Sequence, residues 1–276
     1  MNLECRSERR MTPRQHPRLQ ASLATLLASL MLAGMLGSVP SLEAALDEGG
    51  SGAQVLIGAD DDNVNNPAIQ PPNTTADQSL NNTDILLGGF GNDILIGLLG
   101  SDVLHGGFGH DILIGGPEGA GPPNSDIIFG DFGNDVNIWQ GGDGSDAFIG
   151  GPGLDAMVFG TMDRATATNV PILTAPVEGF PNGVPTANVT GQGGFCTLER
   201  VQDPEFGFEW LVRFFVRSTG ALAVTIRLAE VEQVFCTSQA GGEITYADLT
   251  QASPQFVVVP LDQVPALNSI VGLIIR

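Results

Sequence analysis

Eight aspartates recur at a nearly constant interval between residues 84 and 155. They are Asp84, Asp93, Asp102, Asp111, Asp126, Asp135, Asp146 and Asp155. The interval is nine residues except for one step of 15 and one of 11, so two short insertions interrupt the pattern. Carboxylates repeated in this way are candidate ligands for a hard divalent cation, which prefers oxygen donors.

Each aspartate belongs to a unit that can position it. The unit is Gly-Gly-x-Gly-x-Asp followed by three residues with a large apolar residue in the middle, as in Gly88 to Ile96. Glycines permit the positive φ angles of a tight turn, and the triplet Ile94-Leu95-Ile96 suits a short strand. Repeated turns and strands wind a chain into a solenoid. We expect two units to make one coil.

In such a coil, turns 18 residues apart stack directly. One side would carry Asp84, Asp102, Asp126 and Asp146, and the other Asp93, Asp111, Asp135 and Asp155. At an interstrand spacing of about 4.8 Å, two bare carboxylates repel by roughly 3 kcal/mol at an effective dielectric constant of 20. Ca²⁺ between the turns would remove this repulsion, because it takes six to eight oxygens at about 2.3 to 2.6 Å, whereas Mg²⁺ demands shorter bonds.

These repeats resemble the RTX (repeats-in-toxin) family of calcium-binding nonapeptide repeats, over residues 54 to 160. The resemblance implies a parallel β-roll that holds several Ca²⁺ ions between its turns. The ligands it implies are the eight aspartates together with glycines of the turns, namely Gly89, Gly91, Gly107, Gly109, Gly133, Gly142 and Gly144. The plainer alternative is a glycine-rich solenoid whose aspartates are solvated turn formers.

Some units depart from the pattern. The turn before Asp84 lacks its glycines, and the turn before Asp126 is stretched, so the sequence supports these two sites less strongly. Leu98 and Asp131 replace second glycines, and Asn137 takes the place of an inward apolar residue. We expect long loops at 59–83 and 115–125.

Residues 1–44 have the layout of a secretory signal peptide. Arginines precede an apolar run from Ala21 to Val39, and small residues follow it. A retained membrane anchor is the alternative, because the run approaches the ~20 residues that span a bilayer. We therefore predict a secreted protein, extracellular or periplasmic, that has no membrane association after cleavage.

The charge balance favours cations as ligands and disfavours nucleic acid as a partner. The chain has 31 Asp and Glu against 11 Lys and Arg, for a net charge of −20. Between Asp47 and Asp163 there is no lysine or arginine to neutralise the repeat aspartates. After removal of Cys5 with the signal peptide, Cys196 and Cys236 remain, and we predict a disulfide between them. Two free buried thiols are the alternative.

The sequence after the repeats no longer follows the nine-residue pattern. We expect loops or a linker over 161–192 and a β-rich, antiparallel, sandwich-like domain over 193–276, so that the whole protein is all-β, with a roll over 45–160. Predicted strands are 209–217, 221–235, 255–260 and 270–275. The C-terminal domain is one candidate surface for a protein or cell-surface partner.

The flanking positions of the roll strands are another candidate surface. They should point outward, yet Ile94, Ile96, Ile112, Ile114, Ile127 and Phe129 are apolar. An apolar face of this size usually marks an interface. Either the C-terminal domain or another chain should cover it.

Catalytic patterns are not found, and we assign no role to His105 or His110. The sequence has neither a zinc-binding HExxH helix pattern nor a G-x-S-x-G nucleophile elbow. We therefore expect a calcium-binding structural or interaction protein rather than an enzyme, with calcium driving the folding of the repeats after export. The alternative is a secreted hydrolase with a catalytic C-terminal domain and the roll as a folding aid.

Overall fold

The computed structural model describes residues 45–48, 52–57, 84–117, 125–166, 168–201 and 207–276. The predicted signal peptide and most of the two predicted long loops lie outside these residues. Glu43–Arg276 forms one compact unit.

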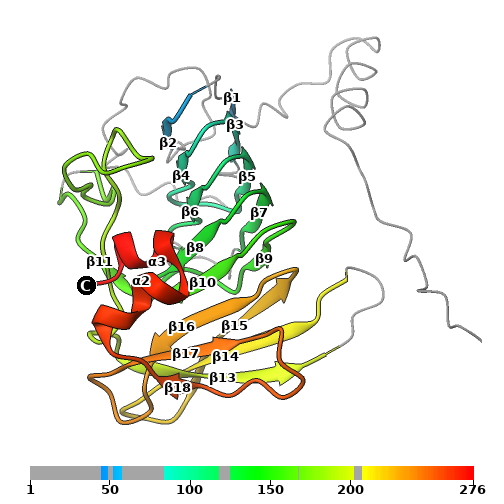
Figure 1. The fold of residues 1–276 in the computed structure, drawn as a ribbon, viewed down its shortest axis with the longest axis vertical. Coiled ribbons are helices and arrows are strands. Elements are labelled where there is room, and N and C mark those ends of the chain that lie inside the picture. The colour runs from blue at the N-terminus through cyan, green and yellow to red at the C-terminus, as the bar shows by residue number, and fades with distance from the viewer. Residues whose placement is uncertain (1–44, 49–51, 58–83, 118–124, 167, 202–206) are drawn as a thin grey trace, which may run out of the picture. The chain divides into compact units, whose positions relative to one another are not determined.

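Two sheets run side by side through the described residues (Figure 1). Sheet A has the order β1-β3-β5-β7-β9-β15-β14-β13, and sheet B has the order β18-β17-β16-β10-β8-β6-β4-β2. The sheet A strands are β1 (Ala45–Glu48), β3 (Asp84–Phe90), β5 (Val103–Phe108), β7 (Ile127–Phe132), β9 (Ala147–Ile149), β13 (Gly194–Arg200), β14 (Trp210–Val216) and β15 (Leu222–Ala229). The sheet B strands are β2 (Val55–Ile57), β4 (Ile94–Ile96), β6 (Ile112–Ile114), β8 (Val136–Trp139), β10 (Ala156–Phe159), β16 (Gln233–Thr237), β17 (Ile244–Asp248) and β18 (Val257–Val258).

The repeat region is the predicted parallel β-roll. Its strands alternate between the sheets, and each pairs in parallel with the strand one coil away, as Leu95 of β4 pairs with Leu113 of β6. The middle residue of each triplet points into the roll. Leu86, Leu95, Leu104, Leu113, Ile128, Phe148 and Met157 are therefore all buried in one apolar core.

The C-terminal strands extend the roll rather than forming a separate pair of sheets. β9 pairs in parallel with β15, and β10 pairs in parallel with β16. Beyond these strands the pairing in both sheets is antiparallel. In sheet A, β15 pairs with β14 and β14 with β13; in sheet B, β16 pairs with β17 and β17 with β18. The core of the roll continues between them, where it includes Val212, Ile226 and Val234.

Two of the predicted C-terminal strands are wrong. Residues 221–235 form β15 and β16 in different sheets, because the chain crosses from sheet A to sheet B at Glu230–Glu232. Residues 270–275 lie mostly in the helix α3 (Ser269–Ile274), whose first turn is capped by the Asn268 side chain. It follows α2 (Val264–Leu267) and a single 3₁₀ turn, Leu261–Gln263.

The outer face of sheet B is covered by the chain itself. Ile94, Ile96, Ile112 and Ile114 are buried against a second apolar cluster. That cluster includes Phe180 and Val184 of the 161–192 segment and Val271 and Ile274 of α3, which lies beside sheet B in Figure 1. The same segment contains the short antiparallel pair β11 (Thr161–Met162) and β12 (Ala187–Asn188). Both the predicted linker and the C-terminal region therefore cover this face.

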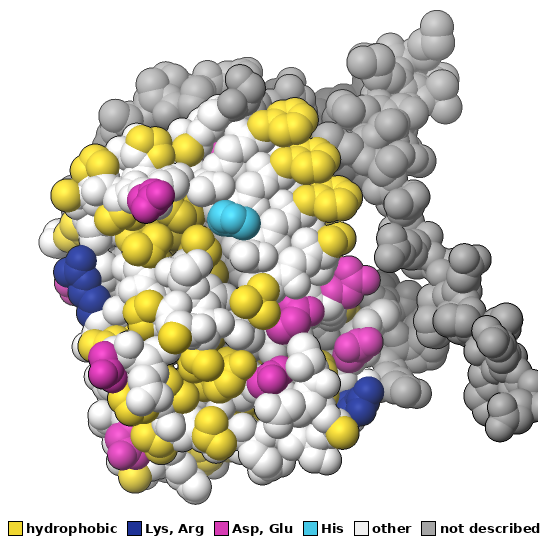
Figure 2. All heavy atoms as spheres, viewed as in Figure 1, with side chains coloured by type: hydrophobic (Ala, Val, Ile, Leu, Met, Phe, Trp, Pro, Cys, Tyr) yellow, Lys and Arg dark blue, Asp and Glu magenta, His cyan; other side chains and the backbone are white. Residues whose placement is uncertain are grey.

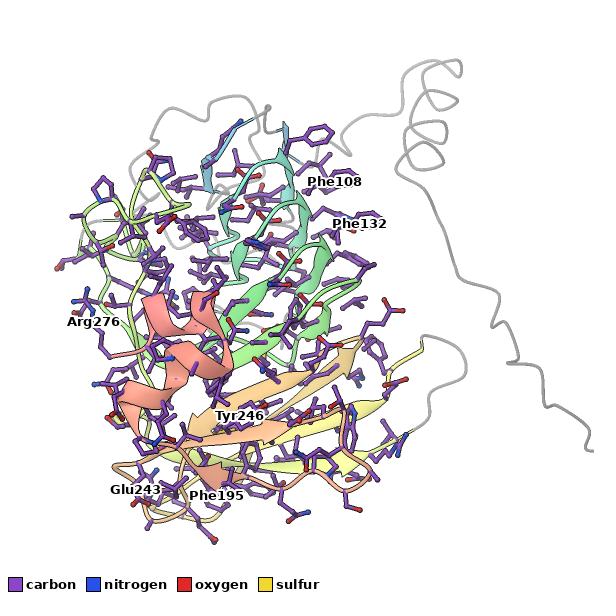
Figure 3. All side chains as sticks on the ribbon, viewed as in Figure 1. Phe108, Phe132, Phe195, Glu243, Tyr246 and Arg276 are labelled. Carbon is purple, nitrogen blue, oxygen red and sulfur yellow. A yellow bond between two sulfur atoms is a disulfide. The ribbon has the colours of Figure 1, made fainter. Side chains whose placement is uncertain are left out.

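The outer face of sheet A keeps exposed apolar side chains. Ile127 is 44% exposed. Along the adjacent turns, Phe90, Phe108 and Phe132 stack with ring centroids 5.0 and 4.9 Å apart. Figure 3 shows Phe108 and Phe132 one above the other, pointing away from the roll.

Candidate calcium sites in the stacked turns

The aspartates preceding sheet B form a continuous hydrogen-bonded column, here called the Asp93 column. The main-chain N–H of each aspartate donates to Oδ1 of the aspartate one coil further on. The N–O distances are 2.7 Å from Asp93 to Asp111, 2.8 Å from Asp111 to Asp135 and 2.8 Å from Asp135 to Asp155. At the other end, the N–H of Gln54 donates to Asp93 Oδ1 at 2.7 Å.

A matching column precedes sheet A. Asp84 donates to Asp102 at 2.8 Å, Asp102 to Asp126 at 2.8 Å and Asp126 to Asp146 at 3.0 Å, always from the main-chain N–H to Oδ1. Asp84 and Asp126 hold the same place as the others, although their turns depart from the repeat pattern. The predicted division of the eight aspartates between two sides of the roll is confirmed.

The aspartates of the Asp93 column are buried with one carboxylate oxygen unsatisfied. Asp93, Asp111, Asp135 and Asp155 are 0% exposed. Each uses Oδ1 in the column, whereas Oδ2 has no hydrogen-bond partner among the described residues. Burying an unpaired charge is costly unless a counter-charge or a metal ion compensates it. These oxygens are therefore the strongest candidates for cation ligands in the described part of the chain.

Burial makes these carboxylates unusually weak acids. It raises the pKa of Asp135 to about 9, that of Asp111 and Asp155 to about 7 and that of Asp93 to about 6. The column hydrogen bond works against the shift in each case. Neighbouring carboxylates raise the pKa further at Asp111, Asp135 and Asp155. A cation bound beside Oδ2 would favour the ionised form instead.

The first glycine of each turn lets a carboxylate oxygen and a carbonyl oxygen come close together, because it has no side chain in the way. A Cβ on Gly88, Gly106 or Gly130 would lie within 3.0 Å of Oδ2 of the aspartate in its own unit and of a main-chain carbonyl oxygen of the next coil. A carboxylate oxygen and a carbonyl oxygen thus converge on each of these positions. Such an all-oxygen environment fits Ca²⁺.

The later glycines of the turns let the coils stack. Gly89 and Gly107 have φ of 92° and 103°, and Leu98 and Asp131 take the same left-handed conformation at 75° and 67°. The third glycines of the turns are packed more closely against the neighbouring coil. Gly91, Gly109 and Gly133 have φ of 124°, 145° and 149°, and a Cβ on Gly109 or Gly133 would overlap the carbonyl oxygen of the glycine one coil before.

The turn that contains Gly142 and Gly144 is different. A Cβ on Gly142 would meet nothing within 4 Å, and the carbonyl oxygen of Gly144 accepts a hydrogen bond from Trp139 Nε1 at 3.1 Å. A Cβ on Gly141 would likewise meet nothing within 4 Å, so Gly141 and Gly142 are not packed against a neighbouring coil. Asp143 is buried here, and its Oδ2 accepts from the N–H of Gln140 at 2.8 Å.

Sequence analysis missed a third column, made by the residues that come directly before the aspartates of the Asp93 column. Asn92 Oδ1 accepts from the N–H of His110 at 2.9 Å, His110 Nδ1 accepts from Asn134 at 2.9 Å, and Asn134 Oδ1 accepts from Leu154 at 3.0 Å. His110 therefore acts as asparagine does in the neighbouring coils, and neutral His110 carries its proton on Nε2. The signal was the Asn-Asp pair that recurs at 92–93 and 134–135.

Side chains alone do not make a complete site. The described residues contain no group of three or more His, Cys, Asp or Glu side chains placed to hold a metal ion. Any calcium ion in the stacked turns would therefore draw most of its six to eight oxygens from main-chain carbonyls and water. The glycine-rich turns are suited to this, because they bring backbone close to backbone.

Stacked glycine turns around buried aspartates, between two sheets of parallel strands, define a parallel β-roll. A family model described as the RTX calcium-binding nonapeptide repeat matches residues 81–117, in four copies. This segment thus consists of RTX repeats, as the sequence pattern predicted, and such repeats bind calcium. No curated protein and no solved structure matches the chain.

Proposed function

We propose that this is an exported calcium-binding protein with a structural or interaction role, in which calcium orders the repeat region after export. The observation that carries the proposal is the Asp93 column, with its four buried Oδ2 atoms that no described residue satisfies. Ions bound only by stacked turns stabilise the folded state, by about 2.7 kcal/mol per site at a hundred times the dissociation constant. Several sites would together match the stability of a typical domain.

Export supplies the calcium that this mechanism needs. Extracellular modules bind Ca²⁺ with dissociation constants of about 10⁻⁴ to 10⁻³ M, so sites of this class stay empty in the cytosol. The apolar run preceded by arginines in residues 1–44 supports an N-terminal export signal. In the described part of the chain, no helix has the length and hydropathy needed to cross a bilayer. Mass spectrometry of the protein recovered from the medium or periplasm should give an N-terminus near residue 45.

The exposed face of sheet A supports an interaction role. Ile127 and the stacked rings of Phe90, Phe108 and Phe132 are exposed in a part of the roll that no described segment covers. Figure 2 shows a row of apolar side chains at the upper right edge of the visible face, where Figure 3 labels Phe108 and Phe132. The chemistry of this surface fits a partner with an apolar patch of its own.

The central test uses the mature full-length chain. Its two tryptophans, Trp139 and Trp210, are buried in the core that the roll shares with the C-terminal strands, so their fluorescence reports on folding. Titration with Ca²⁺, but not with Mg²⁺, should shift the emission cooperatively and increase the β signal in circular dichroism. The double variant Asp93→Asn with Asp111→Asn should need at least tenfold more calcium.

Asp163→Asn is the matched control, because Asp163 is exposed and lies outside the columns. It should titrate as the unchanged protein does. A protein that is fully folded in excess chelator and gains no stability from calcium would overturn the proposal. A hydrolase substrate screen in calcium and in chelator tests the enzymatic alternative on the same samples.

A further inference from the structure

The Asp93 column does not end with the last repeat. The main-chain N–H of Asp155 donates to Oε2 of Glu232 at 2.8 Å. Glu232 lies in the Glu230–Glu232 link between β15 and β16, 77 residues further along the chain. A glutamate from outside the nonapeptide pattern thus takes the place that the next aspartate of the column would occupy.

The backbone of this link imitates one more turn of the roll. The N–H of Gly150 donates to the carbonyl of Ala229 at 3.0 Å, as Gly97 donates to Ile114 at 2.9 Å. After the link, the N–H of Gln233 donates to the carbonyl of Asp155 at 3.0 Å, just as Val136 donates to Asp111 at 2.8 Å. Three residues therefore make the connections that a six-residue turn makes elsewhere.

Oxygen atoms converge at the link as they do between the repeats. A Cβ on Gly150 would lie 2.7 Å from Asp155 Oδ2 and within 3.0 Å of the Glu230 carbonyl oxygen. The two oxygens are thus within about 5 Å of each other, roughly two calcium–oxygen bond lengths. Asp155 is 0% exposed, and its Oδ2 has no hydrogen-bond partner among the described residues.

The surroundings of this position are acidic. Glu230 and Glu232 both raise the pKa of Asp155 beyond the effect of burial. The pKa of Glu232 is itself raised, first by burial and then by Glu230 and Glu209. Figure 2 shows acidic side chains close together on the visible face, near the level where the roll meets the C-terminal strands.

We propose that Asp155 and the Glu230–Glu232 link form an additional calcium site at the C-terminal end of the Asp93 column. Its ligands would be Asp155 Oδ2, the Glu230 carbonyl and the Glu232 carboxylate, completed by water. The proposal rests on the proposed function, but it adds a site that the repeat pattern does not contain. Because one half comes from the repeats and the other from the C-terminal strands, calcium in this site holds the end of the roll to those strands.

The test counts calcium ions on the mature full-length protein by native mass spectrometry and isothermal titration calorimetry. Glu232→Gln removes the charge but keeps an oxygen that can accept from the Asp155 N–H, so the column hydrogen bond is retained. This variant should bind one ion fewer than the unchanged protein and keep its other ions. Glu243→Gln is the matched control, since Glu243 is exposed at the far end of the C-terminal strands (Figure 3).

The outcomes separate the two proposals. If the unchanged protein binds no calcium, the proposed function fails. If it binds calcium and Glu232→Gln binds the same number with the same affinities, the additional site does not exist. Should Glu232→Gln fail to fold, anomalous diffraction from calcium-grown crystals of the unchanged protein decides the matter. A peak beside Asp155 and Glu230 supports the site, and peaks between Asp93 and Asp111 without one there overturn it.

Discussion

Cys196 in β13 and Cys236 in β16 form a disulfide, with Cα atoms 6.1 Å apart. The two strands belong to different sheets. Their sulfur atoms lie inside the core that runs on from the roll. The bond, predicted from the even number of cysteines in an exported chain, thus fastens sheet A to sheet B beyond the last repeat.

Loss of this bond should destabilise the C-terminal strands strongly. It closes a loop of 40 residues, and releasing such a loop in the unfolded chain lowers the free energy of unfolding by about 4 kcal/mol. Guanidinium denaturation of the double variant Cys196→Ser with Cys236→Ser, in saturating calcium, should show this loss. Reductant should lower the free energy of unfolding of the unchanged protein by a similar amount. It should not change that of the double variant.

The calcium-free protein should become less stable as pH rises. Burial raises the pKa of Asp135 to about 9 and that of Asp111 to about 7, from the ordinary 3.8. Between pH 4 and 9 the folded state therefore binds more protons than the unfolded state, and its stability falls with increasing pH. Melting in chelator at pH 5, 7 and 9 should give progressively lower transition temperatures.

Calcium should reverse this trend. Protons compete with Ca²⁺ for the same carboxylates, so the stabilisation by calcium grows as pH rises. The difference in melting temperature between calcium and chelator should be smallest at pH 5. A melting temperature in chelator that climbs from pH 5 to 8 would contradict the burial of unpaired carboxylates.

Asn137 offers a site for stabilisation. It is 2% exposed and points into the roll between Leu113 and Met157 of the neighbouring strands. Its Nδ2 has no hydrogen-bond partner within the described residues. Removing an unsatisfied buried amide should help, so Asn137→Leu should raise the free energy of unfolding by about 1 to 2 kcal/mol. The reverse change in the neighbouring strand, Leu113→Asn, should lower the free energy of unfolding by more than this. Chemical denaturation of the two variants measures both effects.

A pair of glycine variants separates steric overlap from backbone strain. Gly109 and Gly142 both have positive φ, 145° and 112°. A Cβ on Gly109 would overlap the Gly91 carbonyl oxygen, whereas one on Gly142 meets nothing within 4 Å. Gly142→Ala should therefore lower the free energy of unfolding by about 1 kcal/mol, because alanine disfavours the left-handed conformation. Gly109→Ala should lower it by at least twice as much and should also weaken calcium binding. Equal losses for the two would show that the coils are not packed this tightly.

The roll could be predicted from sequence because its information is local. One interval of nine residues specifies the turn, the strand and the inward residue together. It therefore predicts the column of each aspartate and the core positions of Leu95 and Leu113. The departures at Leu98 and Asp131 did not break the pattern. Both residues adopt the left-handed conformation that glycine would have taken, supported at Asp131 by a 3.0 Å contact between Oδ2 and His105 Nδ1.

The C-terminal region was harder because its structure depends on distant contacts. The sequence of residues 221–235 predicts one strand, because it has no glycine or proline to mark the break. The break at Glu230–Glu232 is set by the free edges of β9 and β10. β15 pairs along the edge of β9, and β16 pairs along the edge of β10. Likewise, Ile270 and Val271 suggest a strand by their β-branched side chains. They are helical because Asn268 caps their N–H groups and sheet B offers an apolar face to cover.

The three columns divide the roll into coils, of which those from Asp93 to Asp111 and from Asp84 to Asp102 contain no insertion. In each coil the main-chain N–H of the aspartate donates to the aspartate of the next coil. The steps from Asp93 to Asp111 and from Asp84 to Asp102 are both 18 residues. Excising residues 94–111 would therefore join Asp93 directly to Ile112 and leave every remaining turn above its proper neighbour. The protein would be one coil shorter, by about 4.8 Å, with its C-terminal end unchanged. Variation in the number of coils is thus open to this chain by deletion or duplication of a single 18-residue block, without redesign of either end.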